Sequence, residues 1–336
     1  MKAVVIERCG EVAWRDVPEP PEPGPYEALV RVTAFSICNA TDRHLRDCQL
    51  FGVTEEDCPI LLGHEAVGEA VELGPHCRYL REGDQVLRPM LQLQGYESYW
   101  GAMAQFGLVS DRRSHIQDGS PPGPTVHVGH QVVPPQIEPA HAVTLITLKE
   151  VLSYLRIIGA DEGCRLLVTG HGPVGLAAAY LGREIVGAGR IVVAGRRPEA
   201  EEQVLSFGAD AYVDTREQGW PAAAMDALGG EADVVYETTG AASVNAGALE
   251  ALSEDGTLGP YAARTADQEQ QPLPEDGRFG PGGTDESLSH EELMAATLEG
   301  SIDPERFISH RLRPEEIAGG FELIERREAL KVVFEL

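Results

Sequence analysis

The stretch at residues 166–179 places the tightest constraint on how this 336-residue chain folds. A short apolar run ends in a Gly-x-Gly-x-x-Gly pattern, and a helix-forming run of small residues follows at once. In a strand–turn–helix unit, Gly170 lets the chain turn, Gly172 lets an anionic group approach the backbone, and Gly175 lets the helix pack closely on the strand. The pattern as a whole consists of Gly170, His171, Gly172, Pro173, Val174 and Gly175.

The context of this pattern favours a dinucleotide-binding turn over a purely structural one. A second strand, at residues 190–194, begins about twenty residues later, as the dinucleotide fingerprint requires. The helix N-terminus would present free backbone N–H groups to a diphosphate. From residue 145 to residue 262, helical and strand patterns alternate, which predicts an α/β fold with a doubly wound parallel sheet.

The preceding part of the chain has a different pattern, with short strands separated by Gly and Pro, and predicts a β-rich domain over residues 1–144. A dinucleotide-binding domain is expected over residues 145–287, of which residues 264–287 are polar and predict a loop or a poorly ordered segment. Helices at 290–299 and 314–326 and a strand at 330–336 end the chain. The strands expected in the first domain are at residues 1–7, 28–36, 66–73, 84–88 and 102–108.

The net charge of −27 makes nucleic acid an unsuitable partner, because phosphate binding needs a basic surface. There is no run of about 18 apolar residues, so no membrane span is predicted. The N-terminus does not read as a signal peptide, and a cytoplasmic enzyme is the default expectation. Almost all positive charge is arginine, through GC-rich codon use or adaptation to salt, so an anionic cofactor would need a local cluster of arginines.

The six cysteines form no Cys-x-x-Cys pair, and a chain of this length does not need disulfides for stability. We therefore expect most of them to be buried free thiols.

Two short segments carry side chains suited to metal chemistry: residues 38–44, which begin with Cys38, and the segment around His64 and Glu65. A thiolate, an imidazole and a carboxylate can bind zinc and leave one position for water or substrate. The alternative is a buried thiol at Cys38, a core histidine at His64 and a surface charge at Glu65. The spacing is too long for a zinc finger, so the fold would have to assemble the site.

The end of the second strand of the dinucleotide domain indicates which nicotinamide cofactor is bound. A site that prefers NAD carries an acid there, which binds the ribose 2′-hydroxyl. This chain has Gly195 in that place, followed by Arg196 and Arg197, whose guanidinium groups suit a 2′-phosphate. The sequence predicts NADP(H) over NAD(H), unless the two arginines only flank the strand end and face water.

Several motifs together resemble the zinc-dependent medium-chain dehydrogenases, a superfamily that includes alcohol, polyol and threonine dehydrogenases. The resemblance covers nearly the whole chain and implies a GroES-like β-rich catalytic domain, joined to a Rossmann domain, with residues 288–336 returning to the catalytic domain. The motifs are Gly63-His64-Glu65 with Gly68 and Gly74, residues 101–106, the glycine turn at 170–175, residues 236–241 and residues 329–333.

The resemblance implies one catalytic Zn²⁺ held by Cys38 and His64, with Glu65 as a third ligand or a near neighbour. Thr41 and His44 would pass the alcohol proton to solvent, a role that suits the near-neutral pKa of a histidine. Thr239 and Lys331 would belong to the cofactor-binding residues. The implied substrate is a small-molecule alcohol or ketone, a secondary alcohol or cyclic polyol in particular, and the implied assembly is a homo-oligomer, either a dimer or a tetramer.

The chain departs from the family pattern in three places. Two residues, Asn39 and Ala40, follow Cys38 where relatives have one. No cysteine lies between Cys77 and Cys164, so no structural Zn²⁺ is expected in the four-cysteine lobe of many relatives. Ile146 occupies the position of a further metal ligand, for which Glu150 is either a substitute or an exposed helix residue.

These departures leave two alternatives open. One is a zinc-free reductase of activated double bonds from the same superfamily, in which Cys38 has no role. The other is a non-catalytic relative that binds NADPH.

Overall fold

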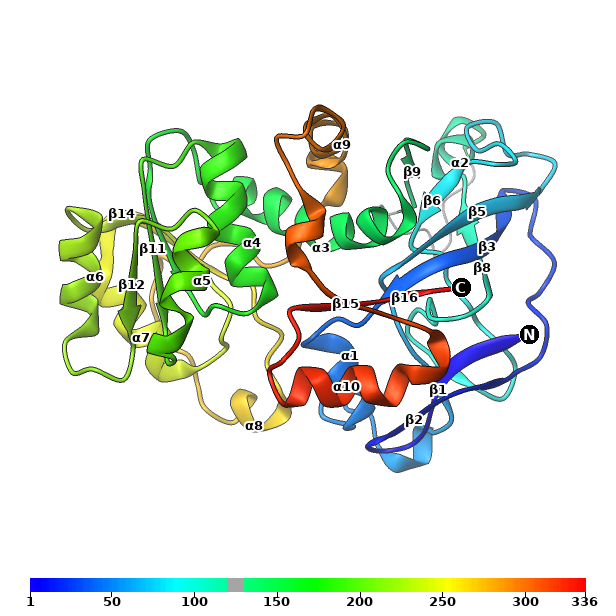
Figure 1. Ribbon diagram of the computed structural model, residues 1–336, viewed down its shortest axis with the longest axis horizontal. Helices are drawn as coiled ribbons and strands as arrows, with labels where there is room; N and C mark the ends of the chain where they lie inside the picture. Colours follow the sequence, from blue (N-terminus) through cyan, green and yellow to red (C-terminus); the bar gives the residue numbers. More distant parts are fainter. Residues whose placement is uncertain (120–129) are drawn as a thin grey trace. The chain divides into compact units, whose positions relative to one another are not determined.

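The protein is described from a computed structural model, which covers residues 1–119 and 130–336. The chain divides into two units, drawn in Figure 1. The first unit joins Met1–Ile146 to His290–Leu336, and the second unit is Thr147–Ser289.

The second unit is built on five parallel strands in the order β12-β11-β10-β13-β14. β10, β11 and β13 each have a central run of buried apolar residues, as is typical of parallel strands covered on both faces. This sheet confirms the predicted doubly wound α/β fold. The strands are β10 (Arg165–Thr169), β11 (Arg190–Gly195), β12 (Ala211–Asp214), β13 (Ala232–Glu237) and β14 (Leu252–Pro260).

Helices pack against alternate side chains of these strands, so they cover both faces of the sheet (Figure 1). A Cβ on Gly182, at the end of α4, would lie 2.9 Å from Leu166 on one face. Trp220 of α6 packs with Leu167 on the other face. The helices are α3 (Pro139–Ile157), α4 (Pro173–Leu181) with a π-helical turn (Gly182–Val186), η3 (Pro198–Ala200), α5 (Glu201–Ser206), α6 (Trp220–Leu228) and α7 (Ala242–Ala251).

The predicted loop at residues 264–287 is mostly irregular, with the short helix α8 (Ala266–Glu269), and η4 (Glu286–Leu288) follows at its end. Backbone hydrogen bonds hold it against β14: Leu258 N–H donates to Arg278 O at 2.9 Å, and Gly280 N–H donates to Leu258 O at 2.8 Å. A buried ion pair between Lys149 and Glu286, at 3.1 Å, fixes its end to α3. The segment is therefore an ordered loop.

The first unit contains two sheets, with the orders β2-β1-β4-β7 and β15-β16-β3-β5-β6-β9, and β8 pairs with β3 in the second of them. Four of the five predicted strands lie close to the observed ones. The fifth, expected at residues 102–108, begins only at Phe106. The strands are β1 (Lys2–Arg8), β2 (Glu11–Asp16), β3 (Glu27–Ser36), β4 (Ile60–Leu61), β5 (Ala66–Leu73), β6 (Gln85–Leu87), β7 (Glu97–Ser98), β8 (Phe106–Ser110), β9 (Val132–Val133), β15 (Ile308–Leu312) and β16 (Lys331–Glu335).

The C-terminal segment completes this unit, because β16 pairs antiparallel with β3 and Phe334 stacks on Phe35 with ring centroids 5.1 Å apart. Phe321 of α10 joins the same core. The helices of the unit are α1 (Thr41–Arg46), η1 (Glu55–Asp57), α2 (Arg112–Gln117), α9 (His290–Glu299), η5 (Pro304–Phe307), η6 (Pro314–Glu316) and α10 (Ile317–Glu325).

The cysteines correct one expectation. Cys9 and Cys48 form a disulfide across 39 residues, with their Cα atoms 5.5 Å apart. Of the four free cysteines only Cys164 is buried, while Cys38, Cys58 and Cys77 are partly exposed. The prediction that most cysteines are buried free thiols is therefore wrong, because tertiary pairing of this kind leaves no signal in local spacing.

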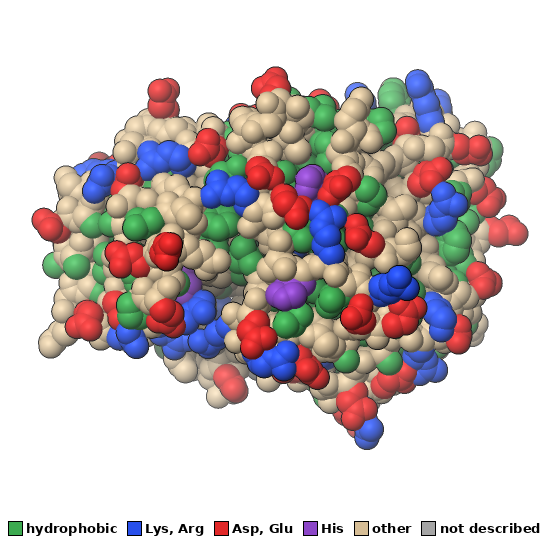
Figure 2. All heavy atoms as spheres, viewed as in Figure 1, with side chains coloured by type: hydrophobic (Ala, Val, Ile, Leu, Met, Phe, Trp, Pro, Cys, Tyr) green, Lys and Arg blue, Asp and Glu red, His purple; other side chains and the backbone are tan. Residues whose placement is uncertain are grey.

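The surface carries the acidic excess of the composition. Figure 2 shows Asp and Glu side chains scattered over the visible face, with Lys and Arg side chains between them. Within the described parts of the chain, no helix has the length and apolar character needed to cross a membrane.

Candidate active site

The strand pairing of the first unit brings Cys38, His64 and Glu65 together. Cys38 lies two residues beyond the end of β3, and His64 and Glu65 directly precede β5, which is the antiparallel neighbour of β3. One ligand atom from each residue lies within 4.8 Å of the other two. His64 and Glu65 are buried and Cys38 is partly buried. A thiol, an imidazole and a carboxylate at this separation form a donor set that fits zinc.

Asp42, on α1, contacts both Cys38 and His64 and fixes their orientation. Its Oδ1 lies 3.0 Å from His64 Nδ1, and its Oδ2 accepts the Cys38 N–H at 2.8 Å. Asp42 is fully buried. A carboxylate on Nδ1 leaves Nε2 as the metal-binding nitrogen, which is the usual arrangement around metal-bound histidines. The sequence singled out Thr41 and His44 and missed Asp42, although an acid between two predicted relay residues was a signal.

Glu65 is held by two donors that both reach Oε2. Lys331 Nζ lies 2.6 Å away and Ser36 Oγ also lies 2.6 Å away. Burial alone would raise the pKa of Glu65, but Lys331 and then His64 lower it to about 2. Lys331, predicted to bind the cofactor, therefore lies on β16 as the ion-pair partner of a candidate metal ligand.

The buried His64 ring lies beside the carboxylate of Asp42. Burial opposes a charged imidazole, yet Asp42 and then Cys38 raise the pKa of His64 well above its ordinary value. Arg88 donates to the backbone oxygen of His64 at 2.7 Å and fixes the backbone there. Such a site favours a bound cation.

His44 and Thr41 lie on α1 beside Asp42. His44 Nδ1 lies 3.2 Å from Gln49 Oε1, and its Nε2 lies 3.2 Å from Arg43 Nη2. Burial and then the positive charge of Arg43 lower the pKa of His44, so the imidazole is neutral at neutral pH. A neutral imidazole is the form that can accept a proton.

Aromatic side chains lie next to His64. The Trp100 ring is 5.0 Å from the His64 ring, and Phe51 and Tyr99 contact each other with centroids 5.1 Å apart. Phe51 is 55% exposed and Tyr99 39%. Tyr96 packs instead against the core cluster that includes Leu61 and Leu91.

Ile146 occupies the position of the family's further metal ligand, and Glu150 is its candidate substitute. Ile146 is fully buried within α3. Glu150, one turn later, accepts a hydrogen bond from the Tyr261 hydroxyl at 3.2 Å.

The glycine turn of the second unit has the geometry that the sequence predicts. Gly170 has a φ of +94°, and a Cβ on Gly175 would lie 2.1 Å from Gly170 O. A Cβ on Gly172 would meet nothing within 4 Å, so the backbone faces open space. Pro173 and Val174 begin α4, with Pro173 in the first turn, where it suits a helix start. The turn therefore leaves room for an anion in front of Gly172.

The His171 side chain contacts Arg197 and fills the space beside Gly195 at the end of β11. Arg197 Nε donates to His171 Nε2 at 2.8 Å, and the Arg197 N–H donates to the Tyr212 hydroxyl, also at 2.8 Å. A Cβ on Gly195 would lie 2.0 Å from His171 Nδ1, so the histidine ring occupies the space that an acidic side chain would need. Arg196 is exposed and Arg197 is partly buried.

A buried carboxylate fixes the turn after β13. Glu237 Oε1 accepts the N–H groups of Thr239 at 2.6 Å and Gly240 at 3.0 Å, and also accepts the Thr239 hydroxyl. Thr238 Oγ1 donates to Thr169 O at 2.7 Å and so ties this turn to the end of β10. β10 and β13 are adjacent, and the chain order reverses between them, which is where ligands bind in doubly wound sheets.

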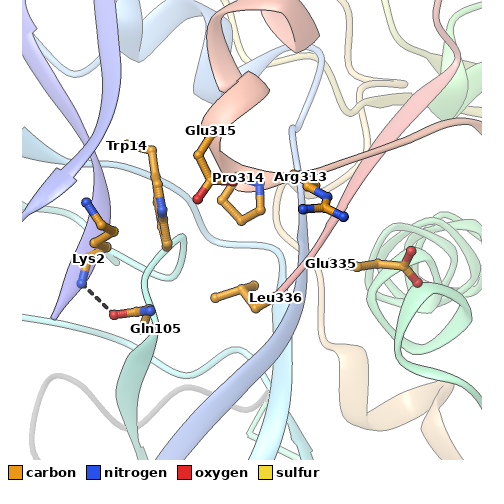
Figure 3. Close-up of a pocket in the computed structure, with 8 residues that line it drawn as sticks. All are labelled: Lys2, Trp14, Gln105, Arg313, Pro314, Glu315, Glu335 and Leu336. Carbon is orange, nitrogen blue, oxygen red and sulfur yellow. Dashed lines mark hydrogen bonds between the residues drawn. The ribbon is translucent and has the colours of Figure 1, made fainter.

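The first unit also has a pocket of about 520 Å³. Figure 3 shows Trp14 and Pro314 lining it, with Arg313 and Glu335 near its edge. None of the candidate metal ligands lines this pocket, so it is separate from the site around His64.

Comparisons with known proteins agree with this geometry. Residues 24–117 match the alcohol dehydrogenase GroES-like domain, and residues 173–277 match the zinc-binding dehydrogenase domain. These two matches together span more than half of the chain. The protein belongs to the zinc-dependent medium-chain dehydrogenase superfamily. This confirms the resemblance, the two-part fold and an enzyme of the alcohol dehydrogenase type.

The dehydrogenase is 27% identical over 353 residues to the NADP-dependent isopropanol dehydrogenase of Thermoanaerobacter brockii. The aligned region covers 97% of this chain and 94% of the relative. It is 28% identical over 247 residues to the L-threonine 3-dehydrogenase of Pyrococcus horikoshii, covering 71% and 69%. Among solved structures, alcohol dehydrogenase TADH from Thermus sp. ATN1 superposes with a TM-score of 0.81 at 26% identity, covering 100% and 99%.

Proposed function

We propose that this dehydrogenase transfers a hydride between NADP(H) and a small secondary alcohol or ketone at one catalytic zinc ion. The observation that carries the cofactor choice is the end of β11, where His171 excludes an acid from position 195 and holds Arg197. The relative from Thermoanaerobacter brockii, named as NADP-dependent, supports the same choice. We retain a dimeric or tetrameric assembly and a cytoplasmic location as predictions from the resemblance, to be tested by light scattering and by cell fractionation.

In the proposed mechanism, Cys38 and His64 would hold the zinc ion, and Asp42 would keep His64 in the metal-binding orientation. Glu65 would complete the set as the third ligand, and the Lys331 ammonium and the Ser36 hydroxyl hold its carboxylate in place. A zinc ion bound there would polarise the carbon–oxygen bond of the substrate, while the nicotinamide exchanges the hydride. Thr41 and the neutral His44 would carry the alcohol proton to solvent.

The NADP(H) proposal is tested by replacing both Arg196 and Arg197 with Ala. KM for NADP(H) should rise by about two to four orders of magnitude, because two charge-assisted hydrogen bonds are lost and each contributes about 1.5–3 kcal/mol. KM for NAD(H) should change little. A higher kcat/KM with NAD(H) than with NADP(H) in the unchanged enzyme would contradict the proposal.

The metal proposal is tested by counting zinc in the purified enzyme and by assaying it with a chelator. We expect about one catalytic zinc per chain and loss of alcohol oxidation when the chelator removes it. Activity that survives metal removal, with reduction of activated double bonds, would instead favour the zinc-free reductase.

The substrate class is tested with a panel of alcohols and ketones. The aromatic side chains beside His64, Trp100 above all, offer an apolar wall, so we expect short secondary alcohols to be oxidised faster than hydrophilic polyols. Firm NADPH binding without activity on any member of the panel would favour the non-catalytic relative.

A further inference from the structure

Three cysteines from separate segments meet at one point in the first unit. Cys9 lies in the turn between β1 and β2, Cys48 lies two residues after α1, and Cys58 directly follows η1. Their sulfur atoms all lie within 4.8 Å of one another. The first two are joined by the disulfide, so the Cys58 thiol lies beside a bonded pair. We call these residues the cysteine triad.

Carboxylates surround the cysteine triad. Glu55 Oε2 accepts the Cys9 N–H at 2.8 Å, which brings that carboxylate next to the sulfurs. Glu55, Asp57 and Glu7 all act electrostatically on the Cys58 thiol. Glu7 is paired with Arg15, and the Asp57 side chain accepts the Thr54 N–H. Glu55 contacts the Cys9 backbone and acts electrostatically on Cys58, and its negative charge favours a bound cation.

Three thiolates with a neighbouring carboxylate form a donor set that suits zinc and similar soft divalent ions. We propose that the cysteine triad is a second metal site, which binds such an ion when the Cys9–Cys48 disulfide is reduced. The site is distinct from the group at Cys38 and His64. It also differs from the four-cysteine lobe of relatives, for which the sequence supplies no cysteines between Cys77 and Cys164.

The reduced, metal-bound form is reached in two steps, reduction of the disulfide and then binding of the metal ion. An external dithiol is oxidised to its own disulfide, the Cys9–Cys48 bond breaks, and the two protons of the dithiol pass to the two cysteine sulfurs. The metal ion then replaces the three thiol protons, which go to solvent. Because sulfurs bonded to each other are not thiolates, the disulfide and the three-thiolate site exclude each other.

Both the disulfide form and the metal-bound form of the cysteine triad would connect the β1–β2 turn to the segment that follows α1. The Gly10 N–H, next to Cys9, donates to Arg46 O at the end of α1 at 2.7 Å. Gln49, next to Cys48, contacts His44. In a reducing compartment the metal ion would therefore replace the covalent link that holds the β1–β2 turn to α1, the helix that carries Asp42 and His44.

The test compares zinc content in two forms of the full-length protein. One form is oxidised, and the other is reduced with a dithiol under anaerobic conditions; both are equilibrated with Zn²⁺, desalted and measured by mass spectrometry. The reduced form should hold about one more zinc per chain than the oxidised form. The same added zinc should raise the thermal unfolding midpoint of the reduced form.

Serine variants locate the additional ion. Cys58→Ser should abolish the difference between the two forms, whereas Cys77→Ser, which removes a partly exposed thiol outside the triad, should preserve it. Equal zinc in both forms of the unchanged protein, or a difference that survives in Cys58→Ser, would overturn the proposal.

A cobalt measurement separates this site from the catalytic one. Reduced Cys38→Ser protein loaded with Co²⁺ should keep the near-ultraviolet absorption of cobalt–thiolate bonds, and the double variant with Cys58→Ser should lose it. Absence of the absorption in Cys38→Ser alone would overturn the triad proposal while leaving the catalytic zinc untouched. Absence of catalytic zinc from the protein with Cys38 intact, with the triad signal retained, would count only against the proposed function.

Discussion

Asp42 determines how His64 is presented, because a single buried carboxylate contacts both the His64 ring and the Cys38 backbone. Replacing Asp42 by Asn keeps the shape but removes the charge. We expect zinc affinity to fall by about 10- to 100-fold, as happens when outer partners of metal-bound histidines are changed. Competition with a chromophoric chelator measures this affinity.

The control for that experiment is Asp16→Asn on β2, which removes an exposed carboxylate that pairs with Lys2. Zinc affinity of this variant should match the unchanged protein, and NADPH binding should be intact in both variants. An Asp42→Asn protein that holds zinc as tightly as the unchanged one would rule out the orienting role.

His44 gives a prediction about pH. Burial is the larger cause of its lowered pKa and Arg43 the next, so the acid limb of kcat/KM for alcohol oxidation should lie below the ordinary pKa of a histidine. Arg43→Met removes one cause and leaves burial, so the limb should move to higher pH without reaching that ordinary value. Arg113→Met, on α2, serves as the control. A limb that stays in place after Arg43→Met would show that His44 is not the titrating group.

Individual residues were the least predictable level of the structure. Cys38, His64 and Glu65 could be selected from the sequence because their residue types suit a metal. The ion pair between Glu65 and Lys331 joins residues that are 266 positions apart, and nothing local to either one indicates it. The contact of His64 with Asp42 depends in the same way on the pairing of β3 with β5.

Among the elements, the β10–α4 turn allows a matched pair of substitutions. Gly175→Ala places a Cβ against Gly170 O and should destabilise the protein by about 1–3 kcal/mol, because backbone cannot move aside cheaply. Gly172→Ala meets open space, so stability should stay within about 0.5 kcal/mol. Dinucleotide binding should weaken in Gly172→Ala, because the added methyl group would enter the space in front of the turn that is proposed for the diphosphate. Urea unfolding and NADPH fluorescence measure the two effects.

A Gly172→Ala protein that binds NADPH as tightly as the unchanged one would place the diphosphate elsewhere. A Gly175→Ala protein of unchanged stability would contradict the close packing of α4 on β10.

The elements that the sequence predicted best have a strong period or a strong motif. The strands of the parallel sheet are apolar runs, and α4 follows directly from the glycine turn. α6 has neither, because its Ala-rich sequence is short and lies between glycine-containing turns, with Pro221 in its first turn. Its position is set by packing, since a Cβ on Gly247 of α7 would lie 2.4 Å from the Trp220 ring.

For the whole molecule, the net charge of −27 creates self-repulsion that folding must overcome. Added salt screens this repulsion within a Debye length of about 10 Å at 0.1 M and about 3 Å at 1 M. We therefore expect the thermal unfolding midpoint to rise between these two concentrations. NaCl and KCl at equal ionic strength should give the same rise if screening is the cause, and a midpoint that falls with both salts would contradict the explanation.

At the scale of the whole chain, composition and motif order predicted the two-part architecture, because each part has its own hydrophobic pattern. The disulfide between Cys9 and Cys48 could not be predicted in this way, since it depends on how the β1–β2 turn meets the end of α1.

The contact between His171 and position 195 also limits how cofactor preference can evolve. An acid at position 195 is the substitution that would favour NAD, yet its Cβ would collide with the His171 ring. A lineage that first changed Gly195 would damage the turn before gaining a new cofactor. If the preference for NADP(H) is as proposed, the accessible order is to lose the imidazole first and to acquire the acid second, so the two substitutions are epistatic.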